Sequence, residues 1–151
     1  MGIILASSSP RRKKILENLG YNFDIVVPNI DEHNINNLNP IDYVIDVSKR
    51  KGLKIHQEYP NDFIISGDTI IEFKNKIIGK PKSKEDAFRT LNILSGKSHY
   101  VISALSLTFS DNQINIFDST KVSFKNLSKI EIEDYINKFN VLDKAGSYNI
   151  E

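Results

Sequence analysis

The side chains best suited to chemistry stand at the ends of short apolar segments, and the first group lies at 7–12 (S-S-S-P-R-R). It follows an apolar strand that starts at Ile3, and it leads into a helix. Free N–H groups at a helix start, together with hydroxyl and guanidinium groups, favour an anion such as phosphate. A solvated helix face has the same residue types, and neither the Walker A nor the dinucleotide glycine spacing is present. The pattern leaves both interpretations open.

A second group consists of carboxylates. Asp31 and Glu32 lie in a polar loop at 29–39, and Asp68 follows the apolar run F-I-I-S at 63–66, beside a glycine. A carboxylate at the end of a buried strand is unfavourable unless something uses it. Two separate carboxylates can hold Mg²⁺ and leave positions for water and phosphate oxygens. Such a carboxylate can also orient or deprotonate an attacking water, so these residues predict hydrolytic chemistry.

Basic side chains complete the set of candidate residues. Lys51 lies in the second half of a predicted helix, and Lys80 lies in the turn G-K-P at 79–81. With Arg12 they could neutralise a polyphosphate. These parts suit hydrolysis of a phosphoanhydride, although spacing alone does not bring them together.

Length and composition limit the function classes. A chain of 151 residues predicts one domain at 1–151. Its net charge of +1 argues against nucleic-acid binding through bulk electrostatics. Without cysteine, the chain has no disulfide, thiol nucleophile or thiolate metal site. No apolar run reaches the length of a membrane span and no secretory signal is present, so we expect a cytoplasmic protein without a membrane partner.

Local signals predict the elements that position these residues. Four helices are expected at 10–19, 40–58, 84–94 and 129–139, each preceded by a capping residue: Ser9, Asn39, Ser83 and Ser128. Strands are expected at 23–27, 63–66, 70–73 and 77–78, followed by a hairpin of 99–109 with 114–124. This order indicates an α/β domain around a mixed sheet.

Apolar periodicity also predicts which faces are buried. At three sets of positions we expect core contacts, listed in chain order: Ile15, Leu16 and Leu19; Tyr43, Val44, Val47 and Leu53; Ile114, Ile116, Val122 and Phe124. The last four fall on one parity of a strand, so one face of that strand is expected to be core.

Six motifs resemble one family in order and spacing. The opening L-A-S-S-S-P-R-R, then I-D-E, S-G-D-T, G-K-P, L-S-G-K-S-H and D-K-A-G-S-Y-N-I-E, resemble the Maf family of nucleoside triphosphate pyrophosphatases. The resemblance covers essentially the whole chain. It implies a Maf/ITPase-like α/β fold, with an elongated mixed sheet flanked by helices and a cleft between two lobes. It also implies hydrolysis of a nucleoside triphosphate to the monophosphate and pyrophosphate, in house-cleaning of nucleotide pools.

The resemblance assigns roles to single residues. Asp68 matches the family's proposed proton acceptor and Glu32 its acidic loop residue, so both are expected to bind a divalent cation, Mg²⁺ or Mn²⁺. Arg12, Lys51 and Lys80 match basic positions that neutralise phosphate. Ser7 matches the first serine of the motif and is expected to donate to a phosphate oxygen.

Three further positions are associated in the family with the choice of base: Arg11, Thr69 and Glu151. The first two match the branch that acts on dTTP and UTP. Glu151 departs, because that branch has Gln, and an ionised carboxylate cannot donate to a pyrimidine O4. The branch that acts on 7-methyl-GTP has Glu there but Trp where this chain has Arg11. The motifs therefore lean toward dTTP/UTP or a modified pyrimidine nucleotide, with 7-methyl-GTP as the alternative.

Further expectations concern the length of the chain, the alternative to an enzyme and the partners. Family members usually continue for several tens of residues with a closing strand, a G-L-P segment and a last helix, so the chain ending at Glu151 is expected to be C-terminally incomplete. A non-catalytic nucleotide-binding regulator of cell division is the alternative to an enzyme. The expected partner is the triphosphate substrate, with a homodimer left open.

Overall fold

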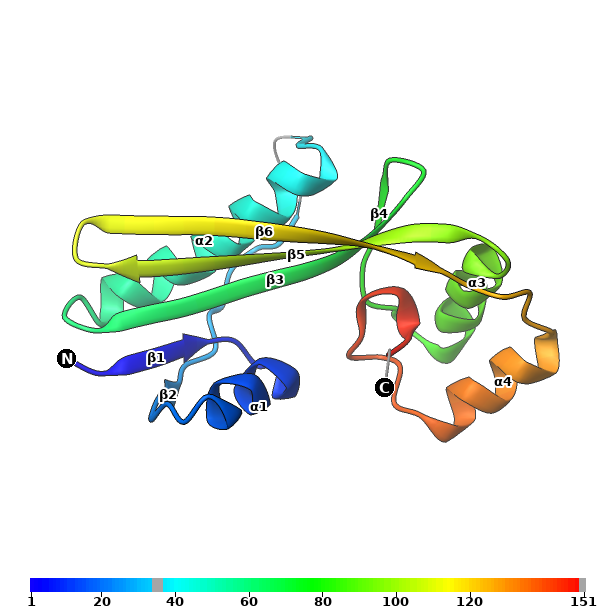
Figure 1. Ribbon diagram of the computed structural model, residues 1–151, viewed down its shortest axis with the longest axis horizontal. Helices are drawn as coiled ribbons and strands as arrows, with labels where there is room; N and C mark the ends of the chain where they lie inside the picture. The colour runs from blue at the N-terminus through cyan, green and yellow to red at the C-terminus, as the bar shows by residue number, and fades with distance from the viewer. Residues whose placement is uncertain (34–36, 150–151) are drawn as a thin grey trace. The chain divides into compact units, whose positions relative to one another are not determined.

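The structure is a computed structural model, and it describes residues 1–33 and 37–149. Figure 1 shows a mixed sheet with helices against it. The sheet has six strands in the order β2-β1-β3-β5-β6, and β4 pairs with β3. The strands are β1 (Ile3–Ala6), β2 (Asp24–Ile25), β3 (Phe63–Phe73), β4 (Lys76–Ile78), β5 (Ser98–Phe109) and β6 (Asn112–Ser123). The helices are α1 (Pro10–Asn18), α2 (Pro40–Glu58), α3 (Lys84–Leu94), α4 (Lys129–Lys138) and the 3₁₀ turn η1 (Ala145–Ser147). The predicted α/β class is confirmed.

The chain forms two compact units. The first unit contains Met1–Asp68 and Ser103–Asp118, and the second contains Thr69–Ile102 and Ser119–Glu151. Strands β3, β5 and β6 contribute residues to both units. The expectation of one domain at 1–151 stays a prediction.

In the first unit, two apolar strands form a parallel pair. β1 lies beside β3 in a register that runs from Ile3 opposite Phe63 to Ala6 opposite Ser66. Continuous apolar runs are typical of strands that are covered on both faces. A small core of Ile4, Ala6, Ile55 and Ile64 forms where α2 contacts these strands. The strand pair therefore fixes where segment 7–9 follows β1 and where residues 67–68 continue along β3.

Helix α2 begins and ends where its sequence signals predict. Asn39 caps it, its side chain accepting from the backbone N–H of Asp42 at 3.0 Å, and Pro40 takes the first turn. The buried side differs from the predicted one, because Leu53 is 44 % exposed. The buried residues are Val44, Val47, Ser48, Lys51, Gly52 and Ile55. Small and polar side chains therefore occupy half of the helix face that meets the sheet.

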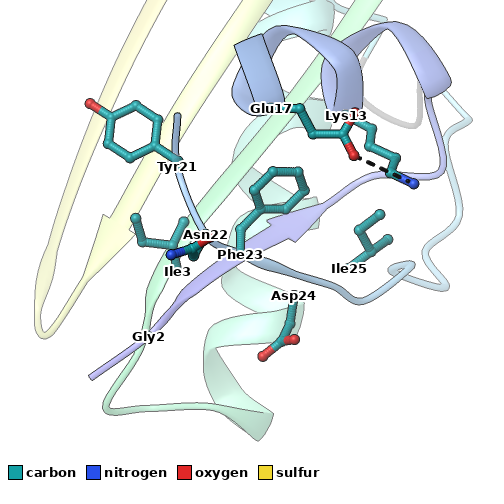
Figure 2. Close-up of a pocket in the computed structure, with 9 residues that line it drawn as sticks. All are labelled: Gly2, Ile3, Lys13, Glu17, Tyr21, Asn22, Phe23, Asp24 and Ile25. Atoms are coloured by element: carbon teal, nitrogen blue, oxygen red, sulfur yellow. Dashed lines mark ion pairs between the residues drawn. The ribbon is translucent and has the colours of Figure 1, made fainter. Parts of the chain in front are cut away.

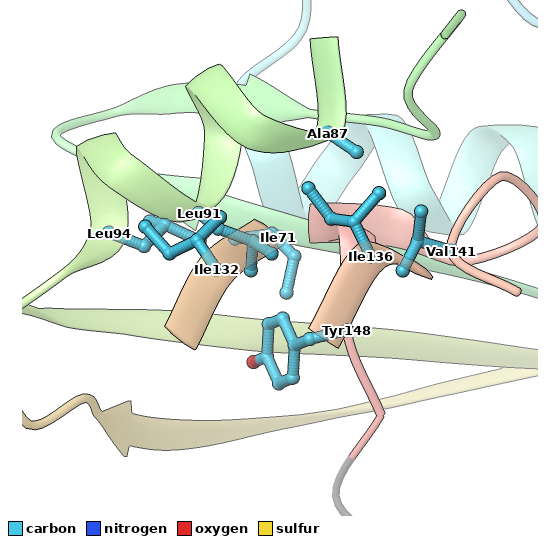
Figure 3. Packing of buried hydrophobic residues seen from close by; sticks show 8 residues of the cluster. All are labelled: Ile71, Ala87, Leu91, Leu94, Ile132, Ile136, Val141 and Tyr148. Carbon is cyan, nitrogen blue, oxygen red and sulfur yellow. The ribbon is translucent and has the colours of Figure 1, made fainter. Parts of the chain in front are cut away.

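The second unit has a hydrocarbon core. α3 begins at the cap Ser83, and α4 begins at the predicted capping box of Ser128 with Glu131. Both helices turn apolar side chains toward β3 and η1 (Figure 3). The buried cluster consists of Ile71, Ala87, Leu91, Leu94, Ile132, Ile136, Val141 and Tyr148. Gly146 lets η1 approach this cluster, because a Cβ there would lie 2.6 Å from the side chain of Ile71.

Three local predictions at the N-terminal helix and β3 are wrong. Ser9 is the N-cap of α1 by position but makes no side-chain capping bond. Ile15 and Leu19 are exposed, and only Leu16 of α1 is buried. Residues 63–66 and 70–73 form one continuous strand, so Asp68 lies inside β3 and not at a strand end. The glycine before it produces no break, because its φ stays outside the left-handed region.

The predicted hairpin is present, but its buried face is only half right. Val122 and Phe124 pack against the hydrocarbon core of the second unit. Ile114 and Ile116, on the same parity, are 62 % and 57 % exposed. Parity places residues on one face, but it does not say how far along the strand that face is covered. Within the described residues, the structure has no helix that is both long and apolar enough to span a bilayer.

Candidate functional site

A lysine and two carboxylates form a charged cluster in the first unit. Lys51 Nζ lies 2.9 Å from Asp68 Oδ1 and 2.8 Å from Glu32 Oε1. The Lys51 and Asp68 side chains are only 11 % and 12 % exposed, whereas the Glu32 side chain is 52 % exposed. The cluster thus has a buried pair and one carboxylate that reaches solvent. The structure brings together three residues that the sequence predicted for the site.

Helix α2 also holds the loop that carries Glu32. The hydroxyl of Tyr43 donates to the backbone carbonyl of Glu32 at 2.7 Å. The guanidinium of Arg50 donates to the backbone carbonyl of Asp31. Because Tyr43, Arg50 and Lys51 all come from α2, one helix positions both the ammonium and the acidic loop. The backbone of the loop is therefore anchored on both sides of the Glu32 carboxylate.

Burial dominates the electrostatics of Asp68. Loss of hydration raises the pKa of Asp68, while the charge and hydrogen bond of Lys51 lower it. Glu32 adds to the rise in pKa, and Arg12 opposes it. Burial raises the pKa of Tyr43 as well, and the charges of Asp68 and Glu32 act in the same direction. The cluster therefore favours a proton on Asp68 more than an exposed aspartate would.

Arg12 contacts the segment that links β1 to α1. Its Nη1 donates to Ser7 Oγ at 2.9 Å, and the backbone N–H of Ser9 donates to the same oxygen at 3.2 Å. Burial lowers the pKa of Arg12, and the charge of Asp68 opposes this. The guanidinium passes over Gly67, where a Cβ would lie 3.1 Å from Arg12 Nε and 2.9 Å from the carbonyl of Ala104. A glycine before Asp68 is thus what allows Arg12 so close to β3.

The remaining predicted residues are placed as follows. Arg11 is exposed at the start of α1, in the first unit. Thr69 is half-buried and Lys80 is exposed, and both belong to the second unit. Glu151 lies outside the described residues. The roles assigned to these four positions stay predictions.

The donor set of the charged cluster fits a hard divalent cation in part. Carboxylate oxygens of Glu32 and Asp68 converge on the one ammonium of Lys51, so they already surround a single cationic position. In the part of the chain that the structure describes, no group of three or more His, Cys, Asp or Glu residues could hold a metal. Mg²⁺ is usually bound by one or two carboxylates plus substrate phosphates, so two carboxylates are sufficient for that mode.

Tyr43 and Arg50, which hold the Glu32 loop, were not found from the sequence. Two buried neighbours of the cluster in the chain were not found either: Gly52, next to Lys51 in α2, and Ser66, two residues before Asp68 in β3. Tyr43 was expected in the core for its apolar ring, and its hydroxyl contact with the Glu32 loop has no local signal. Gly52 in the middle of a helix was a signal that could have been used, because an interior helix glycine is unfavourable without a packing reason.

A separate pocket of about 650 Å³ lies in the first unit beside β1, β2 and α1 (Figure 2). Tyr21, Phe23 and Ile25 give it apolar walls, and the ion pair of Lys13 with Glu17 borders it. None of its lining residues belongs to the charged cluster. The chemistry of the candidate site is therefore not located in this pocket.

Comparison with known proteins gives the same family as the motifs. A family model described as Maf-like protein matches residues 2–151. The chain belongs to this Maf-like family. It is 40 % identical to a dTTP/UTP pyrophosphatase of Vibrio parahaemolyticus, over 100 % of this chain and 80 % of that protein. It is 41 % identical to a dTTP/UTP pyrophosphatase of Pyrococcus abyssi, over 99 % of this chain and 79 % of that protein.

Solved structures support the fold of this Maf-like chain. The Ham1 protein of Staphylococcus aureus matches with a TM-score of 0.54 at 14 % identity, over 82 % of this chain and 71 % of that one. A nucleoside-triphosphatase, dITP/XTP pyrophosphatase, of Mycobacterium abscessus matches with a TM-score of 0.50 at 12 % identity, over 82 % and 74 %. At such identities the likeness concerns the fold alone, and it confirms the predicted Maf/ITPase-like α/β class.

Proposed function

We propose that this Maf-like protein is a nucleoside triphosphate pyrophosphatase, which releases pyrophosphate and a nucleoside monophosphate. The observation that carries the proposal is the cluster of Lys51 with Asp68 and Glu32, next to the Arg12–Ser7 pair. This arrangement combines a buried carboxylate that can accept a proton with cationic side chains that can neutralise the charge of phosphate groups. Relatives about 40 % identical carry the name dTTP/UTP pyrophosphatase, which supports the same reaction class.

In the proposed reaction Asp68 accepts a proton from the attacking water. The water oxygen bonds to the α-phosphorus, the bond from the α-phosphorus to the bridging oxygen breaks, and pyrophosphate leaves with that electron pair. A base works best when its pKa is near the working pH, and burial moves the pKa of Asp68 in that direction. The ammonium of Lys51 lies against the Asp68 carboxylate and lowers the pKa of Asp68, which favours the ionised form that acts as the base.

Phosphate charge would be neutralised by Arg12, Lys51 and Lys80. Ser7 Oγ already accepts from Arg12, so the serine presents its own hydroxyl proton as the group for a phosphate oxygen. Glu32 and Asp68 are the residues that would hold Mg²⁺ or Mn²⁺, which when bound would supply further neutralisation of phosphate charge. Glu32 suits this role because its side chain is half-exposed while its backbone is anchored.

The proposed base preference is dTTP or UTP. Arg11 and Thr69 are the residues proposed to favour these bases, and the names of the relatives agree. Glu151 in place of Gln supports 7-methyl-GTP as the second candidate.

The test is pyrophosphate release from a panel of triphosphates that includes dTTP, UTP and 7-methyl-GTP, with Mg²⁺, with Mn²⁺ and with chelator. We expect turnover that requires a divalent cation and falls about 100-fold or more in Asp68→Asn, the usual range for loss of a general base. Asp111→Asn, in the exposed turn between β5 and β6, is the matched control and should keep wild-type turnover. Absence of turnover in the wild type, or full turnover of Asp68→Asn, would refute the proposal. Triphosphate binding by calorimetry without turnover would instead favour the nucleotide-binding regulator.

A further inference from the structure

Beside the small apolar core, hydroxyl groups fill part of the contact between α2 and the sheet in the first unit. Ser48 of α2, Ser66 of β3 and Ser106 of β5 each have no exposed surface. Ser48 Oγ lies 2.9 Å from Ser106 Oγ, and Ser66 Oγ donates to the backbone carbonyl of Ser48 at 2.9 Å. Ser106 Oγ in turn donates to Asn115 Oδ1 at 2.6 Å. We call these three serines, with Gly52 and Thr108, the hydroxyl seam.

Gly52 marks the closest approach within the hydroxyl seam. A Cβ at this position would lie 2.7 Å from Ser66 Oγ and 2.8 Å from Thr108 Oγ1. Real Cβ atoms essentially never come so close to another heavy atom. The side chain of Thr108 cannot rotate away without losing a hydrogen bond, because its Oγ1 accepts from Gln113 Nε2 at 2.9 Å. The helix and the sheet therefore touch here with no space for one more methyl group.

This closest contact is next to the charged cluster in both elements. Gly52 directly follows Lys51 on α2. Ser66 precedes Asp68 by two residues on β3, and residues two apart in a strand point to the same face. A change in the distance between α2 and β3 at Gly52 and Ser66 therefore also changes the distance between Lys51 Nζ and Asp68 Oδ1, which is 2.9 Å.

We propose that Gly52 and Ser66 are positioning residues, which set the distance between α2 and β3 and so hold the ammonium of Lys51 on the carboxylates of Asp68 and Glu32. As far as it concerns activity, this inference rests on the pyrophosphatase function proposed above. Hydroxyl contacts suit the task because hydrogen bonds have a narrow range of length and direction. Aliphatic side chains would also fill the space, but they would let the helix slide on the sheet.

The test compares four proteins: wild type, Gly52→Ala, the double variant Ser66→Ala with Thr108→Ala, and the triple variant that combines all three changes. In the triple variant, the methyl group added by Gly52→Ala takes the space that the two hydroxyl oxygens vacate. We expect kcat/KM with the best triphosphate to fall about tenfold or more in Gly52→Ala, since small displacements of catalytic groups have effects of this size. The double variant should lose about fivefold, because α2 can settle into the space that the two hydroxyl oxygens vacate. The triple variant, in which a methyl group refills that space, should regain about fivefold over Gly52→Ala.

Thermal unfolding of the same proteins separates positioning from stability. The triple variant lacks two hydrogen-bonding hydroxyls, so it should be no more stable than Gly52→Ala although it is more active. Gly2→Ala is the matched control, because its added Cβ would have only an ordinary contact of 3.4 Å with Asp62 Oδ1. A folded Gly52→Ala with wild-type kcat/KM, or a triple variant no more active than Gly52→Ala, would overturn the proposal.

Competitive acetylation of lysines, read by mass spectrometry, tests the same positioning without any substrate. Lys51 should react slowly in the wild type, faster in Gly52→Ala and slowly again in the triple variant, because its ammonium is buried between two carboxylates. Lys13 and Lys54, whose side chains are 50 % and 45 % exposed, serve as internal references. If the wild type shows no turnover, the proposed function fails and this measurement still decides the positioning role. Unchanged Lys51 reactivity in all four proteins would overturn it.

Discussion

The two units bury helices against the same strands by different means. In the first unit, the small apolar core around Ile55 is joined by the hydroxyl seam, in which Ser48 of α2 and Ser66 of β3 are fully buried. In the second unit, α3 and α4 contact β3 through aliphatic side chains such as Leu94 and Ile132. Hydrocarbon contacts stabilise in proportion to buried area and are not directional. Hydrogen bonds add little net stability but fix a geometry.

The difference follows the chemistry that each unit carries. The first unit holds Lys51 against Asp68 and Glu32, and such a contact depends on tenths of an ångström. The second unit offers a large buried cluster and no comparable charged group within its described residues. We therefore expect substitutions in the second unit to act mainly on stability, and substitutions at Gly52 and Ser66 of the hydroxyl seam to act mainly on turnover.

The largest effect on stability is expected for Leu94→Ala. Leu94 is fully buried between the helices of the second unit, so truncation removes hydrocarbon contacts and leaves a cavity. We expect a loss of about 3 kcal/mol in the free energy of unfolding, measured by urea denaturation. Ile93→Ala is the control, because Ile93 is 46 % exposed on the same helix. If Leu94→Ala lowers the free energy of unfolding no more than Ile93→Ala does, the expected role of the second unit's core in stability is contradicted.

A smaller loss of stability with a large loss of turnover is expected for Gly67→Ala. The added Cβ would press on the carbonyl of Ala104 at 2.9 Å and on Arg12 Nε at 3.1 Å. Overpacking of this kind typically removes about 2 kcal/mol, and the displaced guanidinium should reduce kcat/KM about tenfold. The two quantities come from urea denaturation and from the pyrophosphate assay. Full activity in a destabilised variant would show that the place of Arg12 does not matter for turnover.

The sequence predicted the elements far better than their contacts. The bounds of α2 and α3 agree with the prediction to the residue because local signals mark their ends, Asn39-Pro40 for α2 and Ser83 for α3. The family followed from ordered motifs, whereas the phosphate roles of Arg12, Lys51 and Lys80 stay proposals. The contact of Lys51 with Asp68 did not follow from local signals, because it depends on how deeply α2 lies on β3.

The wrong predictions of burial have one physical cause. Leu53 and Ile116 have the apolar character of core residues, yet both are exposed. Burial depends on which partner covers a face, and periodicity contains no information about the partner. Gly52 and Ser48 show the converse, since two residues with little apolar surface occupy the centre of a buried contact.

A further expectation concerns Ser48→Ala, which removes one hydroxyl of the seam. Its contact of 2.9 Å with Ser106 Oγ is lost, but no atom is added between α2 and β3. We expect about 1 kcal/mol less stability, the usual net value of one hydrogen bond, and kcat/KM close to wild type. A tenfold loss of activity would mean that Ser48 positions the cluster as directly as we propose for Gly52 and Ser66.

The smallest effect is expected at the start of α4. Hydrogen bonds from Lys125 and Ser128 lower the pKa of Glu131 to about 2 from its ordinary 4.5. The folded state thus favours the ionised form, so Glu131 stabilises above about pH 4.5, and this stabilisation is lost as the pH falls toward 2. Glu131→Gln should be less stable than wild type at pH 7, with a difference that shrinks below pH 4.5 in urea titrations. Glu133→Gln, exposed on the same helix, is the control; a difference that grows in acid would contradict the sign.

The outer strand of the sheet has a practical consequence for handling the protein. Among the strands of the described residues, β6 is last in the strand order, and it exposes Ile114, Ile116 and Phe117 in the first unit. An outer strand with apolar side chains is a template onto which another chain can pair. At high concentration this strand is where intermolecular association would start, so a lysine in place of Ile116 should lengthen the time for which a concentrated sample stays monodisperse.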